Sequence, residues 1–168
     1  FSASVSFRMN DGAGLSLSAG TAITAGYAFC GGLYLPRGTY TGTGYGSEGV
    51  TETDWITGPG TLTVTADTTC WIGESGGSWS DPANWTDGLP ESGREAYFIS
   101  GSGDFEIAVP DDAVMPEKLF VCGTGGATVT LSGSMTFEKT WIEIAAGGRI
   151  VIPEGKKFLY TGVDGSGE

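Results

Sequence analysis

The sequence contains no histidine, and only 8 of its 168 residues are lysine or arginine. The lack of histidine removes the commonest general base and metal ligand, which excludes Ser/His/Asp catalysis, Cys/His catalysis and histidine-based zinc sites. Because there are 20 acidic residues, the formal net charge is -12, and nucleic acid is not an expected partner. Membrane insertion is not expected either, since no apolar run approaches the roughly 18 residues that span a bilayer.

Helix-forming sequence is scarce as well. Glycine accounts for 30 residues, and no window carries the apolar spacing of an amphipathic helix. Short runs instead alternate apolar and polar residues, most regularly in residues 127–162, which is typical of strands. We therefore predict an all-β fold, as a parallel β-helix of stacked short strands, with a β-sandwich as the alternative. The side chains expected to face one continuous core are Val129, Leu131, Ile142, Ile144, Ile150 and Ile152.

The centre of the chain is rich in loops and crowded with tryptophan. Trp71, Trp79 and Trp85 lie among glycines, prolines and acidic residues. A β-helix needs bulky apolar side chains in irregular backbone to cover its open end. The pattern therefore favours a tryptophan-rich loop or cap at the start of a β-helical body.

The sequence motifs of this central region resemble those of a known kind of module. Residues 71–73 read W-I-G, residues 77–85 read G-S-W-S-D-P-A-N-W, and residues 88–90 read G-L-P. This resembles the opening of Gly/Thr-rich repeat modules in bacterial secreted autotransporter-like and adhesin-like surface proteins. The closing motifs of such modules resemble L-P-R-G-T-Y-T at residues 35–41 and I-T-G-P-G-T-L-T-V at residues 56–64.

The closing motifs precede the opening motif in this chain. The resemblance therefore implies that residues 1–69 are the C-terminal part of one β-rich module and that residues 70–168 begin the next, or that the chain is one module in a shifted frame. It carries no catalytic residue, so we expect no enzyme and no cofactor. What it implies is a structural module of an extracellular or cell-surface fibre, adhesin or surface layer. The expected partners are other copies of the chain or adjacent modules of the same protein.

Extracellular polysaccharide is the alternative partner. Trp79 and Trp85 stand in the Gly/Pro-rich loop, where exposed indole rings would stack on the C–H faces of sugars. Packing in a core or a cap is the competing explanation of the same residues. The two functions are a polysaccharide-binding module, whose tryptophan fluorescence should change with some glycan, and a structural module, which should self-associate and respond to none.

Carboxylates in turns are candidate calcium ligands, because calcium binds oxygen. The candidates are Asp81, Asp111 and Asp112. The sequence has no D-x-D-x-D-G loop with a distal glutamate, and aspartates in turns commonly bond their own backbone. Calcium is therefore a candidate ligand that the motifs do not require.

Three cysteines allow at most one internal disulfide, and none has the C-x-x-C spacing of a zinc cluster. A bridge from Cys70 to Cys30 is slightly favoured over one to Cys122. Three buried thiols are the alternative.

Both ends of the chain have the alternation of unfinished β-structure. Phe1, Val5 and Phe7 lie in an alternation of apolar and polar residues that begins at the first residue. Near the other end, no polar segment that would terminate a strand directly follows Phe158 and Tyr160. Unpaired strand edges invite another chain. We predict that these two regions pair with a neighbouring copy or with each other.

Overall fold

The protein is almost entirely β-structure, which confirms the predicted all-β class. One short 3-10 helix, η1 (Pro82–Asn84), accompanies the strands. No helix among the described residues is long and apolar enough to cross a membrane. The computed structural model describes residues 6–9, 12–30, 32–99, 104–111, 113–122, 128–138, 140–144 and 146–161.

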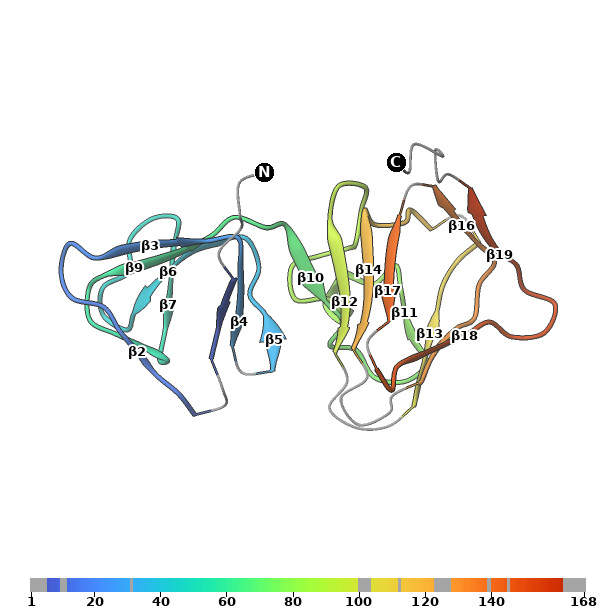
Figure 1. The fold of residues 1–168 in the computed structure, drawn as a ribbon, viewed down its shortest axis with the longest axis horizontal. Helices are drawn as coiled ribbons and strands as arrows, with labels where there is room; N and C mark the ends of the chain where they lie inside the picture. Colours follow the sequence, from blue (N-terminus) through green and yellow to red (C-terminus); the bar gives the residue numbers. More distant parts are fainter. Residues whose placement is uncertain are drawn as a thin grey trace. The chain divides into compact units, whose positions relative to one another are not determined.

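The chain divides into two compact units, unit 1 (Phe1–Thr68) and unit 2 (Thr69–Glu168) (Figure 1). The division lies one residue from the boundary expected between residues 69 and 70. That the two units are pieces of successive modules stays a prediction.

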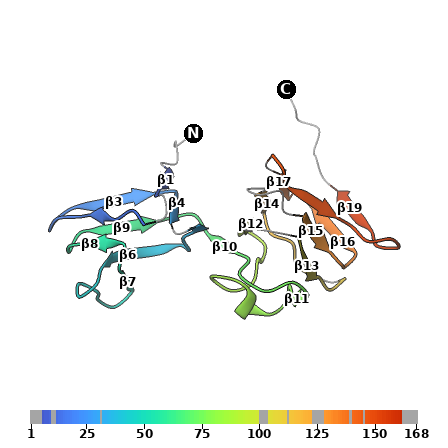
Figure 2. The ribbon, with the colours of Figure 1, turned by 90° about the horizontal axis from the view of Figure 1, so that it is seen from below.

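Unit 1 mixes parallel and antiparallel pairing. β1 pairs with β4, β2 with β8, and β3 with β9, all parallel, whereas β4 pairs with β5 and β6 with β9 in antiparallel fashion. Figure 2 shows β3, β9 and β6 side by side. The strands are β1 (Ser6–Arg8), β2 (Leu15–Ser16), β3 (Ala22–Ala25), β4 (Tyr27–Cys30), β5 (Leu33–Tyr34), β6 (Gly38–Gly42), β7 (Val50–Thr53), β8 (Ile56–Thr57) and β9 (Thr61–Val64).

The closing motif of unit 1 is used for close packing. Leu62 and Val64 alternate with threonines on β9 and point into the core, as period-two alternation requires. Gly58 has a φ of 98°, and any Cβ there would overlap the carbonyl oxygen of Leu17. Glycine is required at this position because both its backbone angle and its surroundings exclude a side chain.

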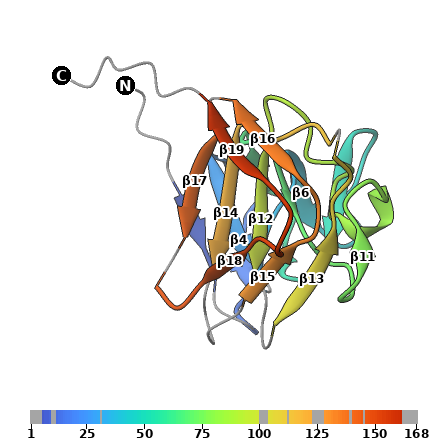
Figure 3. The same ribbon diagram turned by 90° about the vertical axis from the view of Figure 1, so that its right-hand side faces the viewer.

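Unit 2 distributes its strands over three sheets. Sheet I has the order β10-β12-β14-β17, sheet II the order β11-β13-β15-β18, and sheet III pairs β16 with β19. Figure 3 shows β12, β14 and β17 side by side. The strands are β10 (Thr68–Cys70), β11 (Gly77–Ser78), β12 (Glu95–Ile99), β13 (Phe105–Ala108), β14 (Lys118–Cys122), β15 (Thr128–Leu131), β16 (Met135–Glu138), β17 (Trp141–Ile144), β18 (Arg149–Val151) and β19 (Phe158–Thr161).

The core of unit 2 lies between these sheets and contains most of the side chains expected there. Val129 and Leu131 are fully buried, and Ile142, Ile150 and Ile152 are half-buried against the same core. The prediction for Ile144 is wrong, because that side chain is largely exposed. β17 is the last strand of sheet I, so among the described residues no further strand covers Ile144.

Candidate functional site

The three tryptophans of the W-x-G to N-W motif form one buried cluster at the start of unit 2. Trp85 stands edge-on to both neighbours, with ring centroids 5.2 Å from Trp71 and 5.1 Å from Trp79. Phe98 of β12 closes the cluster from the core side, 5.7 Å from Trp85. Edge-to-face pairs are favoured by the ring quadrupole, by about 0.5–1.5 kcal/mol each beyond the area they bury.

The polar side chains of the W-S-D-P-A-N-W loop bond the loop itself. The Asp81 carboxylate accepts a hydrogen bond from the Ala83 N–H at 3.0 Å and so caps η1. The Asn84 side-chain amide donates to the Ser78 carbonyl at 2.9 Å, and the Trp85 indole N–H donates to the Trp79 carbonyl at 2.9 Å. The residues that carry the resemblance therefore hold a compact loop in one shape.

Glycine in the same motif allows the loop to close on Trp71. A Cβ at Gly73 would lie 2.6 Å from the Asn84 Oδ1 atom and 2.7 Å from the Trp71 ring. A Cβ at Gly77 would lie 3.0 Å from the same ring. The W-x-G spacing is explained by this contact, since only glycine leaves room for the indole beside the amide of Asn84.

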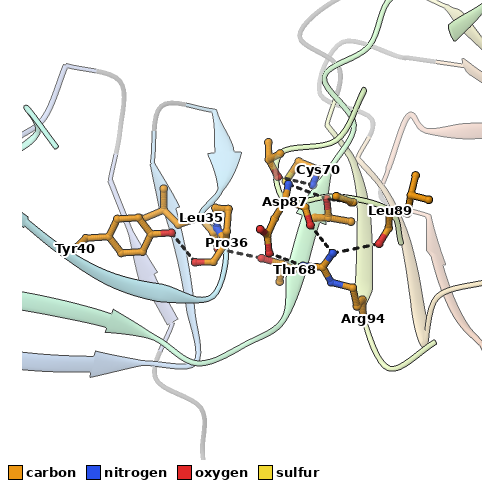
Figure 4. Close-up of polar contacts among 11 residues, drawn as sticks. Leu35, Pro36, Tyr40, Thr68, Cys70, Asp87, Leu89 and Arg94 are labelled. Atoms are coloured by element: carbon orange, nitrogen blue, oxygen red, sulfur yellow. Dashed lines mark hydrogen bonds and ion pairs between the residues drawn. The ribbon is translucent and has the colours of Figure 1, made fainter. Parts of the chain in front are cut away.

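A second set of contacts fixes the segment that follows the tryptophan loop. The Arg94 guanidinium pairs with the Asp87 carboxylate and donates to the Leu89 carbonyl at 3.1 Å (Figure 4). The Cys70 N–H donates to the Thr86 hydroxyl at 2.9 Å. The Arg94 contacts tie this residue to residues within and before the G-L-P motif, and the last bond ties Thr86 to strand β10, so the segment from residue 86 to residue 94 is held against the start of unit 2.

The closing motif of unit 1 is likewise occupied with its own structure. The Tyr40 hydroxyl donates to the Pro36 carbonyl at 2.6 Å, and the Thr68 hydroxyl donates to the Leu35 carbonyl at 3.0 Å (Figure 4). Thr41, which is buried, donates to the Gly60 carbonyl at 3.0 Å. Tyr40 and Thr41 of L-P-R-G-T-Y-T thus satisfy backbone acceptors within unit 1, and Thr68 satisfies a backbone acceptor of the motif itself.

Trp79 and Trp85 are not exposed for sugar stacking, and their burial favours the competing explanation of packing in a core or a cap. Both indoles are buried in the cluster, because Trp79 packs on Trp85 and Phe98, and Trp85 packs on Trp71 and Phe98 as well. Trp79 lines a hollow of about 240 Å³ together with Leu89 and Val114. The tryptophan that sequence reasoning missed is Trp141, which is 67% exposed at an outward position of β17.

The candidate calcium ligands are used elsewhere or lie apart. Asp81 caps η1, while the Asp111 carboxylate accepts from the Ser134 N–H at 2.8 Å and lies 4.0 Å from the Lys156 ammonium. Asp112 lies outside the described residues. Within the described part of the chain, no group of three or more acidic or cysteine side chains gathers to hold a metal.

The predicted bridge between Cys30 and Cys70 is wrong. Cys30 is a free, buried thiol at the end of β4, in a different unit from Cys70. It lines a hollow of about 340 Å³ together with Asp54 and Trp55. Burial raises the pKa of Cys30 to about 11, because a thiolate is poorly solvated there. The Cys122 side chain is outside the described part of the structure.

We expect Cys30 to resist alkylation in the folded chain. Raising the thiol pKa from 9.0 to about 11 lowers the thiolate fraction at neutral pH by about a hundredfold. The same pKa shift makes the stability of the fold depend on pH. Below pH 9.0 the thiol is protonated in both states and the free energy of unfolding is unaffected. As the pH rises from 9.0 toward about 11, the unfolded chain loses this proton first, so the free energy of unfolding falls. Iodoacetamide labelling of the Cys30 peptide, read by mass spectrometry with and without urea, measures the effect. Equal labelling rates in both conditions would contradict it.

The residues predicted to mediate assembly fall into three groups. Phe1 and Val5 lie outside the described residues. Phe7 lies on β1, half-buried against the core of unit 1 and paired in register with Ala28. Phe158 and Tyr160 lie on β19, where they are partly exposed and paired on one side with β16. Their association with another copy stays a prediction.

A comparison of this chain with models of protein families, with curated proteins and with solved structures finds no match.

Proposed function

We propose that the chain is a structural module of an extracellular bacterial fibre, adhesin or surface layer, self-associating or repeated in tandem, whose second unit coils as a parallel β-helix behind a tryptophan cap. In this proposal the function of the chain is to form a defined shape and to contact neighbouring modules. It assigns the chain no catalytic reaction and no cofactor.

The observation that carries the proposal is the strand order of unit 2. The chain supplies strands to sheets I, II and III in rotation: β14, β15 and β16 are followed by β17, β18 and β19, each paired in parallel with its predecessor. Parallel pairing between consecutive passes is the geometry of a coil, whereas β-sandwiches are built from antiparallel sheets. The pairing therefore favours the β-helix over the alternative.

Side-chain columns through the coil support the same proposal. Leu119 on β14 pairs with Ile142 on β17, and Val129 on β15 pairs with Ile150 on β18, all facing the core. Each layer thus repeats the apolar character of the layer before it, at the strand spacing of about 4.8 Å. Such a column gains burial with every added layer, which is the physical reason that coils of this kind extend into long rods.

The tryptophan cluster supports a structural role for the opening motif. Its indoles cover the first layers of the coil through Phe98 and the core of unit 2. An open β-helix end exposes apolar side chains and unpaired backbone, so a compact lid there stabilises the body behind it. The extracellular location is supported by the resemblance of this motif and by the acidic charge of -12, which suits solubility outside a cell.

Titration with a panel of polysaccharides tests the proposal against the binding alternative. We expect tryptophan emission to stay unchanged with every glycan, because Trp71, Trp79 and Trp85 are buried in one cluster. The variant Trp141→Ala removes the exposed indole and serves as the control for weak stacking at the surface. A saturable emission change with one glycan, retained in Trp141→Ala, would overturn the proposal and establish a polysaccharide-binding module.

A further inference from the structure

The last three strands of unit 2 form an uncovered end, here called the terminal triplet (β17, β18 and β19). Each is the last strand of its sheet, and within the described ranges no strand pairs with its outer edge. Its inward side chains are far more exposed than those they follow in register: Val121, Met135 and Phe137 are 0%, 3% and 0% exposed, whereas their partners Ile144, Phe158 and Tyr160 are 48%, 36% and 43% exposed. In the part of the chain that the structure describes, no strand covers the apolar column at this end.

Aromatic stacking runs into the same open end. The rings of Phe137 and Phe158 stack with centroids 4.5 Å apart and planes 29° apart. That separation is close to the spacing of neighbouring strands. The outer face of Phe158 therefore stands where the next layer of a coil would place another apolar side chain.

The first three strands of unit 1 form a matching end, here called the first triplet (β1, β2 and β3). Each lies at the edge of its sheet and pairs in parallel with a later strand on one side only, as far as the described residues show. Its inward residues Phe7, Leu15 and Ile23 are only half-buried. Their register partners Ala28, Ile56 and Leu62 are buried.

The chain spacing of the first triplet is that of a turn of unit 2. Strands β1, β2, β3 and β4 begin at residues 6, 15, 22 and 27, which are intervals of 9, 7 and 5. Strands β14, β15, β16 and β17 begin at residues 118, 128, 135 and 141, which are intervals of 10, 7 and 6. The chain therefore uses a similar number of residues to pass through the three strands of each triplet, which supports placing one triplet over the other.

Charge favours one register between the two triplets. Setting Phe7 beside Ile142, both of which face inward, brings Arg8 beside Glu143, both of which are exposed. Glu143 already lies 3.3 Å from the Lys118 ammonium on the other side. Arg8 would thus complete a row of alternating charge across three neighbouring strands, which stabilises cross-strand pairs.

We propose that the terminal triplet of one copy is covered by the first triplet of a second copy, strand for strand and in parallel, so that copies join head to tail. This rests on the proposed function and names the partner of that assembly. A contact between two different surfaces leaves one surface of each kind free on a dimer, so further copies can add, as an open chain or as a ring where the rotation between copies closes.

Sedimentation of the full chain over a concentration series reaching the millimolar range tests the contact. We expect the mass to rise with concentration without stopping at a dimer. The variant Ile144→Lys places a charge in the covered column and is expected to weaken association on the order of a hundredfold. Val114→Lys is the matched control, since Val114 is an exposed apolar residue of unit 2 outside the terminal triplet, and it is expected to associate like the parent.

A charge exchange tests the register. Arg8→Glu and Glu143→Arg each set like charges opposite one another in a homogeneous sample, and each is expected to weaken association on the order of tenfold. An equimolar mixture restores opposite charges at every joint and is expected to recover the parent mass. A two-fold contact between identical ends would show no such recovery.

The outcomes separate this inference from the proposed function. Assemblies that Ile144→Lys leaves intact, a mixture that does not recover, or a monomer at every concentration would each overturn the head-to-tail contact. A monomer in which Ile144→Lys alone lowers the melting temperature would identify the cover as the chain's own first triplet, which also overturns it. None of these results produces a glycan response, so the structural role is judged separately.

Discussion

Replacing Gly133 with alanine is expected to unfold unit 2. A Cβ at this position would overlap the Val109 carbonyl oxygen and lie 2.8 Å from its carbonyl carbon and 3.1 Å from its Cβ. The neighbouring Ser132 is fixed from two sides, since its N–H and its hydroxyl both donate to the Ile107 carbonyl at 3.1 Å. Backbone atoms held in this way do not move aside as a flexible side chain would.

The size of this effect depends on whether side-chain or backbone atoms must move to make room for the new methyl group. Overpacking by one methyl group in a core costs about 1–3 kcal/mol when side chains adjust, and overlap with backbone costs more. The free energy of unfolding of small domains is only about 5–15 kcal/mol. We therefore expect the substitution to remove a large part of the free energy of unfolding of unit 2. Thermal melting followed by circular dichroism and tryptophan emission measures it.

Gly14→Ala is the matched control for this substitution. A Cβ at Gly14 would meet only the Trp55 carbonyl oxygen, at an ordinary 3.6 Å. Alanine in such a place is neutral or slightly stabilising, because it restricts the unfolded chain. If Gly133→Ala melted at the same temperature as Gly14→Ala, the close approach of these two segments would be refuted.

Much of the strand content could be predicted because alternation acts locally. Val129 and Leu131 face the core as their spacing requires, and the regular stretch of residues 127–162 supplies β15 to β19. The same reasoning failed at Ile144. This residue has the right spacing, but it lies on the last strand of sheet I and its side chain is exposed. Alternation states which face a side chain occupies, and only the sheet order states whether another strand covers that face.

The tryptophan loop shows why the candidate site was harder to predict. The sequence left both packing in a cap and exposure in a loop open for Trp79 and Trp85, and both residues are buried. Their burial depends on η1, on the Asn84 amide and on the narrow space beside Gly73, none of which has a repeating pattern in the sequence. Cys30 is a similar case, because the burial of its thiol at the end of β4 follows from the packing of unit 1 and not from the spacing of the cysteines in the sequence.

Removing the central indole is the second large effect we expect. Trp85 contacts Trp71, Trp79 and Phe98, so Trp85→Ala leaves a cavity at the junction of cap and core. Truncation of a buried tryptophan costs about 3–5 kcal/mol. Trp141→Ala removes an exposed indole from the same unit and should change the free energy of unfolding by about 0.5 kcal/mol or less. Urea unfolding of both variants gives the comparison.

A pair of milder variants distinguishes packing from hydrogen bonding in the same cluster. Trp85→Phe removes an indole N–H that donates to the Trp79 carbonyl at 2.9 Å, whereas Trp71→Phe removes a buried indole N–H that has no hydrogen-bond partner among the described residues. Both variants lose similar ring area, but only the first leaves a buried acceptor without its donor, which costs about 1–3 kcal/mol. We therefore expect Trp85→Phe to unfold at clearly lower urea than Trp71→Phe. Equal midpoints would show that the indole bond to Trp79 contributes nothing, and that ring packing alone holds the tryptophan cluster against the core of unit 2.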